Sequence, residues 1–143
     1  MSTIYLDNAA TTKVREEVVS VISSIIKNEY GNPSSTHSYG RSSKSLIESS
    51  RKEIADILNV KSSEIIFTSG GTEGDNMIIR NCVNNLGVSH IITTKIEHHA
   101  VTHTIDDLIR SNNINVSYVK VSKSGHVDLN DLEEILKRSD EKS

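Results

Sequence analysis

The sequence contains few of the residues that mark the more specialised classes of protein. Its 143 residues include no Trp, one Phe, one Pro and one Cys, and aromatic residues make up 3% of the chain. The single cysteine, Cys82, excludes an internal disulfide and is compatible with a reducing, cytoplasmic location. With so few aromatic side chains, the core has to be built mainly from Ile, Val and Leu.

Charge and hydropathy exclude further classes. The formal net charge is −3, and acidic and basic residues are mixed along the chain, so that no basic stripe indicates nucleic acid and no polybasic cluster indicates a membrane surface. No apolar run is long enough to span a bilayer, and the N-terminus lacks the pattern of a signal peptide. The length of 143 residues is enough for one domain with its own core, and the sequence shows no boundary to another. We expect one domain over residues 1–143, with no second domain.

Apolar periodicity predicts helices that alternate with strands. Helical spacing is found over 14–25, 46–58, 77–82, 101–109 and 132–136, and strand patterns over 64–68, 88–94 and 115–121. Thr12 is expected to cap the first helix, and Asp128 the last, with Asp131 at the capping-box position. This order of elements predicts an α/β fold with a parallel sheet, and about three strands make that sheet resemble the front part of a larger domain.

Residues 64–76 join a β-prone run to a turn that is rich in hydroxyl groups and glycine. Either Thr72 or Ser69 can cap the helix that follows, whose free N–H groups and dipole would attract an anion. Three glycines allow a ligand to approach the backbone closely: Gly70, Gly71 and Gly74. The spacing matches neither the dinucleotide fingerprint nor the Walker A loop, and a plain strand-to-helix connection is the alternative interpretation.

A second unusual segment, residues 95–99, also follows a predicted strand. It contains His98 and His99 directly after Glu97. Ligands of parallel α/β sheets bind beyond the carboxyl ends of the strands, and both this segment and the glycine turn lie at such ends. We therefore expect the two segments to share one crevice.

Four segments in order resemble the motifs of the cysteine desulfurases (NifS/IscS-like), which are pyridoxal-phosphate (PLP) enzymes of aminotransferase class V and fold type I. The segments are YLDNAATT at 5–12, YGNPSSTH at 30–37, FTSGGTEG at 67–74 and EHHAV at 97–101. The resemblance covers most of the chain. It implies an incomplete three-layer α/β sheet, similar to the N-terminal part of the large domain of a fold type I PLP-dependent transferase.

The resemblance also implies roles for single residues. Gly71 and Thr72 would bind the phosphate of pyridoxal 5′-phosphate, and His98 would stack on its ring and act as the catalytic residue that handles protons. Four residues would lie in the vicinity of the substrate: Asn8, Ala9, Asn32 and His37.

Enzymes of the resembled family convert L-cysteine to L-alanine and an enzyme-bound persulfide, whose sulfur goes to iron–sulfur cluster assembly or thiolation. Full-length members form homodimers and pass sulfur to a scaffold protein. The resemblance places their cofactor-binding lysine and persulfide cysteine after the position that corresponds to residue 143, so we expect this chain to be truncated. Cys82 falls instead on an apolar helical face, where we predict a core residue. The chain alone is therefore expected to be inactive.

Other interpretations remain open at this stage. His99 and His103 are spaced one helical turn apart, as in some zinc sites, but no third ligand completes a recognised pattern and we expect no metal. The chain could instead be a non-catalytic relic or a subunit of a split enzyme that binds a phosphate ligand or a complementary chain. A selenocysteine lyase or another class V enzyme would share the same motifs.

Overall fold

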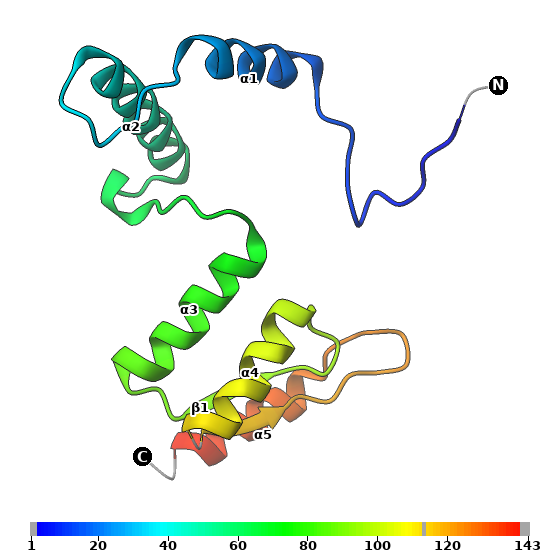
Figure 1. Cartoon of the computed structure of the whole chain (residues 1–143). Helices are drawn as coiled ribbons and strands as arrows, with labels where there is room; N and C mark the ends of the chain where they lie inside the picture. The colour runs from blue at the N-terminus through cyan, green and yellow to red at the C-terminus, as the bar shows by residue number, and fades with distance from the viewer. Residues whose placement is uncertain (1–2, 113, 141–143) are drawn as a thin grey trace. The chain divides into compact units, whose positions relative to one another are not determined.

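The computed structural model describes residues 3–112 and 114–140 (Figure 1). The chain falls into two compact units, Met1–Ile66 and Phe67–Ser143, each of which is described by itself. That residues 1–143 form one domain stays a prediction. Among the described residues, no helix combines the length and the apolar character that crossing a bilayer requires.

The first unit contains helices α1 (Glu16–Asn28) and α2 (Ser38–Leu58) and the short 3₁₀ helix η1 (Ser62–Glu64). The predicted cap at Thr12 is wrong, because the N-cap position of α1 is Arg15 and no side chain caps the helix there. The preceding chain is held in a turn, in which the amides of Ala10 and Thr11 donate to the Asp7 carbonyl. The helix therefore begins several residues after Thr12, with Glu16 and Glu17 in its first turn. Acidic side chains at this position interact favourably with the positive end of the helix dipole.

The second unit alternates helices and strands in the order α3 (Gly71–Leu86), β1 (His90–Thr93), α4 (His99–Asn112), β2 (Asn115–Tyr118) and α5 (Leu129–Asp140). The two strands are parallel neighbours, with His90 opposite Asn115 and Thr93 opposite Tyr118. The α/β class and the parallel pairing that the sequence predicts are confirmed.

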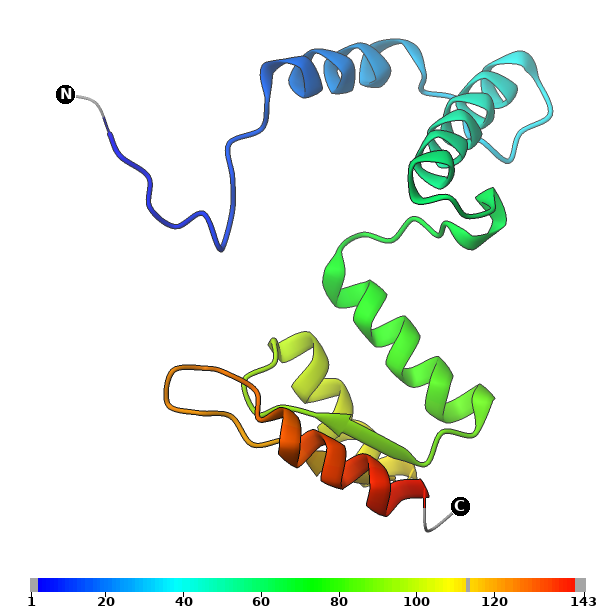
Figure 2. The ribbon, with the colours of Figure 1, turned by 180° about the vertical axis from the view of Figure 1, so that it is seen from behind.

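The sheet of the second unit is covered on both faces. On one face, Val83 of α3 and Leu108 of α4 form a buried cluster with Ile114, against which Ile91 of β1 and Val116 of β2 pack. On the other face lies α5, and Figure 2 shows it on the opposite side of the sheet from α4. Ser139 of α5 bonds to the ring of His90 there, which also contacts Ser117. The unit is thus a small three-layer α/β sheet.

The predicted strand at 64–68 is wrong. Glu64 ends η1, and residues 65–68 have no strand neighbour in the described part of the chain. The Ile65 carbonyl accepts a hydrogen bond from the Arg51 side chain rather than from a strand, and Ile66 and Phe67 are 64% and 49% exposed. An apolar, β-prone run becomes a strand only where a neighbouring strand satisfies its backbone, so the described sheet has two strands rather than about three.

The link from β2 to α5 confirms one predicted cap and corrects another. The Asp128 carboxylate accepts from the amides of Asn130 and Asp131 at 3.0 and 3.2 Å, as expected of an N-cap. The Asp131 carboxylate does not complete a capping box, because it accepts from the amide and the side chain of Lys120 at 2.9 and 2.8 Å. These two hydrogen bonds hold the pKa of Asp131 below its ordinary value.

Candidate functional site

The helix after the glycine turn, α3, is not capped in the way the sequence predicts. Its N-cap is Gly70, so the expected caps Ser69 and Thr72 are both wrong. The Glu73 carboxylate instead reaches back and accepts from the Ser69 amide at 2.6 Å. Hydrogen bonds from the side chain and the backbone of Ser69 hold the pKa of Glu73 below its ordinary value. A charged residue inside the first turn therefore closes the turn that a hydroxyl group was expected to close.

This arrangement leaves the first amides of α3 available. In the described part of the chain, the Gly74 amide bonds to the Gly70 carbonyl at 3.1 Å, whereas the amides of Gly71, Thr72 and Glu73 donate to no protein atom. A Cβ placed at Gly70 or at Gly71 would meet no atom within 4 Å, and the Thr72 side chain is exposed. The N-terminus of α3 thus offers N–H donors, a hydroxyl group and the positive end of a helix dipole to an anion in open space.

His98 is the N-cap of α4. Its carbonyl accepts from the Val101 amide at 2.9 Å, and its ring atom Nδ1 accepts from the Ala100 amide at 3.1 Å. Because Nδ1 is an acceptor, the neutral ring carries its proton on Nε2. The ring is exposed, and its orientation is set by the backbone of the helix that it caps.

The loop that leads from β1 to His98 is fixed by its own polar contacts. The Thr94 hydroxyl donates to the Glu97 carboxylate at 2.9 Å, and Thr94 itself is buried. Glu97 therefore has a structural role in the segment, and the segment follows the carboxyl end of β1 as the sequence predicts.

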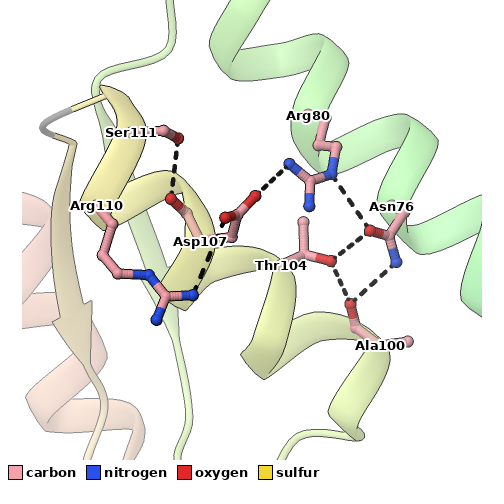
Figure 3. Close-up of polar contacts among 7 residues, drawn as sticks. All are labelled: Asn76, Arg80, Ala100, Thr104, Asp107, Arg110 and Ser111. Atoms are coloured by element: carbon pink, nitrogen blue, oxygen red, sulfur yellow. Dashed lines mark hydrogen bonds and ion pairs between the residues drawn. The ribbon is translucent and has the colours of Figure 1, made fainter.

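Side-chain contacts hold α3 and α4 together along their length (Figure 3). Near the start of both helices, the Asn76 amide group donates to the Ala100 carbonyl at 3.4 Å. Further along, the Arg80 side chain donates to the Asp107 carboxylate at 2.7 Å. Both contacts advance in the same direction along the two helices, so the helices run parallel and their N-termini lie at the same end. The glycine turn and His98 are therefore at one end of this helix pair.

The predicted substrate-vicinity residues all belong to the first unit. Asn8 and Ala9 lie in the turn that starts at Asp7. The side chain of Asn32 accepts from the Ser34 amide at 2.9 Å, and Nδ1 of His37 accepts from the Gly40 amide at 3.4 Å, which makes His37 the N-cap of α2. That these residues join Gly71, Thr72 and His98 in one site stays a prediction.

The other side chains considered in the sequence are those of His99, His103 and Cys82. The rings of His99 and His103 stack with centroids 5.0 Å apart, and the described residues contain no group of three side chains placed to hold a metal ion. Cys82 is half-buried rather than buried, because the core of the second unit is centred on its neighbour Val83.

Sequence reasoning missed Asn76 and Thr104, which join the two helices of the site. The Thr104 hydroxyl lies 2.7 Å from Oδ1 of Asn76 and 2.7 Å from the Ala100 carbonyl. The one available signal was that Asn76 follows Thr72 by a single helical turn, which says nothing about α4.

Comparison with known proteins identifies the family. The family described as Aminotransferase class-V matches residues 4–141. The chain belongs to the class-V aminotransferases. Enzymes of this family in general depend on pyridoxal phosphate, and the family resemblance of the motifs is thereby confirmed.

Similar sequences are named cysteine desulfurases. The cysteine desulfurase IscS of Dictyoglomus turgidum is 43% identical over 140 residues, which are 94% of this chain and 34% of that protein. The cysteine desulfurase IscS of Methanosarcina thermophila is 44% identical over 131 residues, which are 90% of this chain and 32% of that protein. The chain thus spans about a third of the length of these relatives.

Solved structures agree with the sequence relatives. A NifS-like protein superposes with a TM-score of 0.82 at 37% identity, over 89% of this chain and 35% of that one. The structure of SspA in complex with cysteine superposes with a TM-score of 0.81 at 33% identity, over 92% of this chain and 38% of that one. The fold is therefore part of a fold type I domain, as the motifs imply.

Proposed function

We propose that this chain provides the phosphate-binding turn and the ring-stacking histidine of a PLP-dependent cysteine desulfurase. The observation that carries the proposal is the parallel packing of α3 and α4, with free N–H groups at the start of α3 and His98 at the start of α4. The similarity to cysteine desulfurases over nearly the whole chain supports the choice of substrate, L-cysteine.

The residues present fit the cofactor. A phosphate dianion requires several donors and a positive potential, which the first amides of α3, the Thr72 hydroxyl and the dipole of a 16-residue helix supply. The absence of a side chain at Gly71 leaves the approach open. A flat pyridine ring suits a flat and exposed partner, which His98 provides.

Within such a site, each part of the chain has a separate task. When bound, pyridoxal phosphate supplies an electron sink for the carbon next to the carboxylate of the amino acid substrate. Gly71 and Thr72 hold the phosphate and so fix one end of the cofactor. His98 fixes the plane of the ring, and its Nε2 is the nitrogen that can hold or move a proton, because Nδ1 is bonded to the Ala100 amide.

The finer parts of the proposal follow the family. Asn8, Ala9, Asn32 and His37 would contact the substrate end of the site. The whole enzyme would be a cytoplasmic homodimer that converts L-cysteine to L-alanine and passes persulfide sulfur to a scaffold protein for iron–sulfur cluster assembly or to thiolation. The solved complex of the relative SspA with cysteine supports the substrate.

A chimera tests the proposal. Residues 4–141 would replace the matching third of the Dictyoglomus turgidum desulfurase, and alanine formation from L-cysteine would be measured. Thr72→Ala should raise the dissociation constant for pyridoxal phosphate roughly tenfold to a hundredfold, since a hydrogen bond to a charged group is worth about 1.5–3 kcal/mol. Ser42→Ala, which removes an exposed hydroxyl group from α2, is the control and should leave cofactor affinity unchanged.

Adjacent histidines test the assignment of the ring partner. His98→Ala should reduce turnover and shift the absorbance band of the bound cofactor, whereas His99→Ala should change neither. The reverse result would place the ring partner one residue later. A chimera that binds no pyridoxal phosphate, or a Thr72→Ala variant with undiminished affinity, would overturn the proposal.

A further inference from the structure

Asn76 has no role in the proposed function, yet its side chain bonds to both helices of the site (Figure 3). Its Nδ2 group donates to the carbonyl of Thr72 at 2.9 Å and to the carbonyl of Ala100 at 3.4 Å. Its Oδ1 atom accepts from the hydroxyl of Thr104 at 2.7 Å. One half-buried side chain is therefore bonded to the phosphate-binding turn and to two residues of α4.

The contact with Ala100 leads directly to His98. The Ala100 carbonyl faces Asn76, while the amide of the same residue donates to Nδ1 of His98 at 3.1 Å. Thr72, Asn76, Ala100 and His98 thus form a continuous path from the phosphate-binding turn to the imidazole ring.

The α4 side of this path is buried. Ala100 and Thr104 are 6% and 2% exposed. The Thr104 hydroxyl has one proton for two acceptors, Oδ1 of Asn76 and the Ala100 carbonyl, so without Asn76 it would still donate to Ala100. Loss of Asn76 would therefore remove the link to α3 and leave the buried groups of α4 bonded to each other.

We propose that Asn76 is a positioning residue, which fixes the place of the His98 ring relative to the phosphate-binding turn at Gly71 and Thr72. The proposal rests on the proposed function for the identity of the ligand. The other polar link between the helices, between Arg80 and Asp107, lies further from the N-termini and is exposed on both sides, 41% and 46%. Such an ion pair contributes little, so it cannot replace Asn76 in holding this end of the helix pair.

Two variants and one control separate the contacts. Asn76→Asp keeps the size of the side chain and its acceptor, but it turns a carboxylate oxygen towards the carbonyl groups of Thr72 and Ala100. Asn76→Ala removes all of the contacts and decides the question if the first variant does not fold. Asp107→Asn weakens the exposed ion pair and alters none of the three partners Thr72, Ala100 and Thr104; Arg80, which also donates to Oδ1 of Asn76 at 3.4 Å, is not substituted.

The measurement needs no cofactor. In the isotopically labelled chain, both Asn76 variants should accelerate amide hydrogen exchange at Ala100 about tenfold, which corresponds to about 1.4 kcal/mol. Both variants should also shift the ring signals of His98. Asp107→Asn should do neither. Exchange at Leu108, in the core of the same helix, should stay unchanged in all variants, because a general loss of stability would accelerate both sites equally.

A second arm separates this proposal from the proposed function. The probe is pyridoxine 5′-phosphate, which has the phosphate and the ring of the cofactor but no aldehyde that would react with lysines. In the unsubstituted chain it should shift the Thr72 amide and the His98 ring together, and in Asn76→Asp the Thr72 amide alone.

The outcomes are distinct. If the probe shifts neither group in the unsubstituted chain, the proposed function fails, and the exchange data still judge Asn76. The positioning role is overturned if Ala100 exchange and the His98 ring are unaffected in both Asn76 variants, or if Leu108 exchange rises by the same factor as that of Ala100.

Discussion

His98 has two roles that a pair of substitutions can separate, because its ring both caps α4 and faces the solvent. His98→Ala removes the acceptor of the Ala100 amide, a bond of 3.1 Å at the second residue of the helix. Loss of an N-cap side chain costs about 1 kcal/mol, within a range of roughly 0.5–2 kcal/mol. His98→Asn removes the imidazole but keeps a strong capping group, since Asn is among the most favoured N-cap residues.

The stability of the chain should therefore respond to the cap and not to the ring. For a urea dependence of about 1–3 kcal/mol per molar, the loss in His98→Ala lowers the unfolding midpoint by about 0.3–1 M. His98→Asn should unfold close to the unsubstituted chain. His99→Ala is the matched control, because it alters the neighbouring imidazole without removing the cap. Helical circular dichroism as a function of urea measures all of these.

Catalysis in the chimera should divide the same variants differently. Neither Ala nor Asn can stack as an imidazole does or carry a proton at Nε2, so both His98 variants should lose turnover. If His98→Asn is as unstable as His98→Ala, the His98 ring stabilises α4 by packing rather than by capping. The inference that the ring proton is on Nε2, which depends on the capping hydrogen bond, would then fail. If His98→Asn turns over L-cysteine normally, the stacking role is wrong.

Two further predictions concern the fold around the site. A Cβ at Gly40 would lie 2.6 Å from the carbonyl oxygen of Asn32, so Gly40→Ala should lower the thermal midpoint by an amount equivalent to roughly 1–3 kcal/mol. A Cβ at Gly74 would have its nearest atom 3.8 Å away, so Gly74→Ala should raise the midpoint by an amount equivalent to about 0.5–1 kcal/mol. Shifts of the two midpoints in the same direction would contradict this reasoning. The pKa of Asp131 is lowered and that of Lys120 is raised by their hydrogen bond, so the pair should stabilise the fold between about pH 4 and pH 10, and the contribution of Asp131 should be lost as the pH falls through its lowered pKa. Urea midpoints between pH 2 and pH 7 should therefore fall less steeply in Asp131→Asn, and equal slopes would refute the assignment.

The elements that the sequence predicts well are those whose cause is local. The helical periodicity before Cys82 and after His99 lies within α3 and α4, and the Asp128 cap needs only the amides of the next helical turn. Residues 64–68 also have a local sequence pattern typical of a strand. A strand, however, forms only beside another strand, and hydropathy does not show whether one is present. Its Ile65 carbonyl is bonded by the Arg51 side chain instead.

The candidate site divides along the same line. The resemblance to the family motifs points to Gly71, Thr72 and His98, and the structure places all three at the starts of helices. Asn76 acquires its place only when α3 packs against α4, more than twenty residues along the chain, and no spacing within either helix shows this contact. The predicted cap of α3 fails for a related reason, since a hydroxyl group was expected and the Glu73 carboxylate accepts from the Ser69 amide instead. No cap was predicted for α4, where the His98 ring accepts from the Ala100 amide.

The use of imidazole as a cap also bears on which helix takes the phosphate. Both helices begin at the same end of their pair, and their dipoles alone would attract an anion equally. In α4, the groups of His98 already accept from three amides near the helix start, those of Ala100, Val101 and Thr102. In the described part of the chain, three amides at the start of α3 have no acceptor: those of Gly71, Thr72 and Glu73. The ring and the carbonyl of His98 thus make α4 a weaker anion site than α3. This difference supports the proposal that the phosphate binds at α3 and that the cofactor ring stacks on the imidazole.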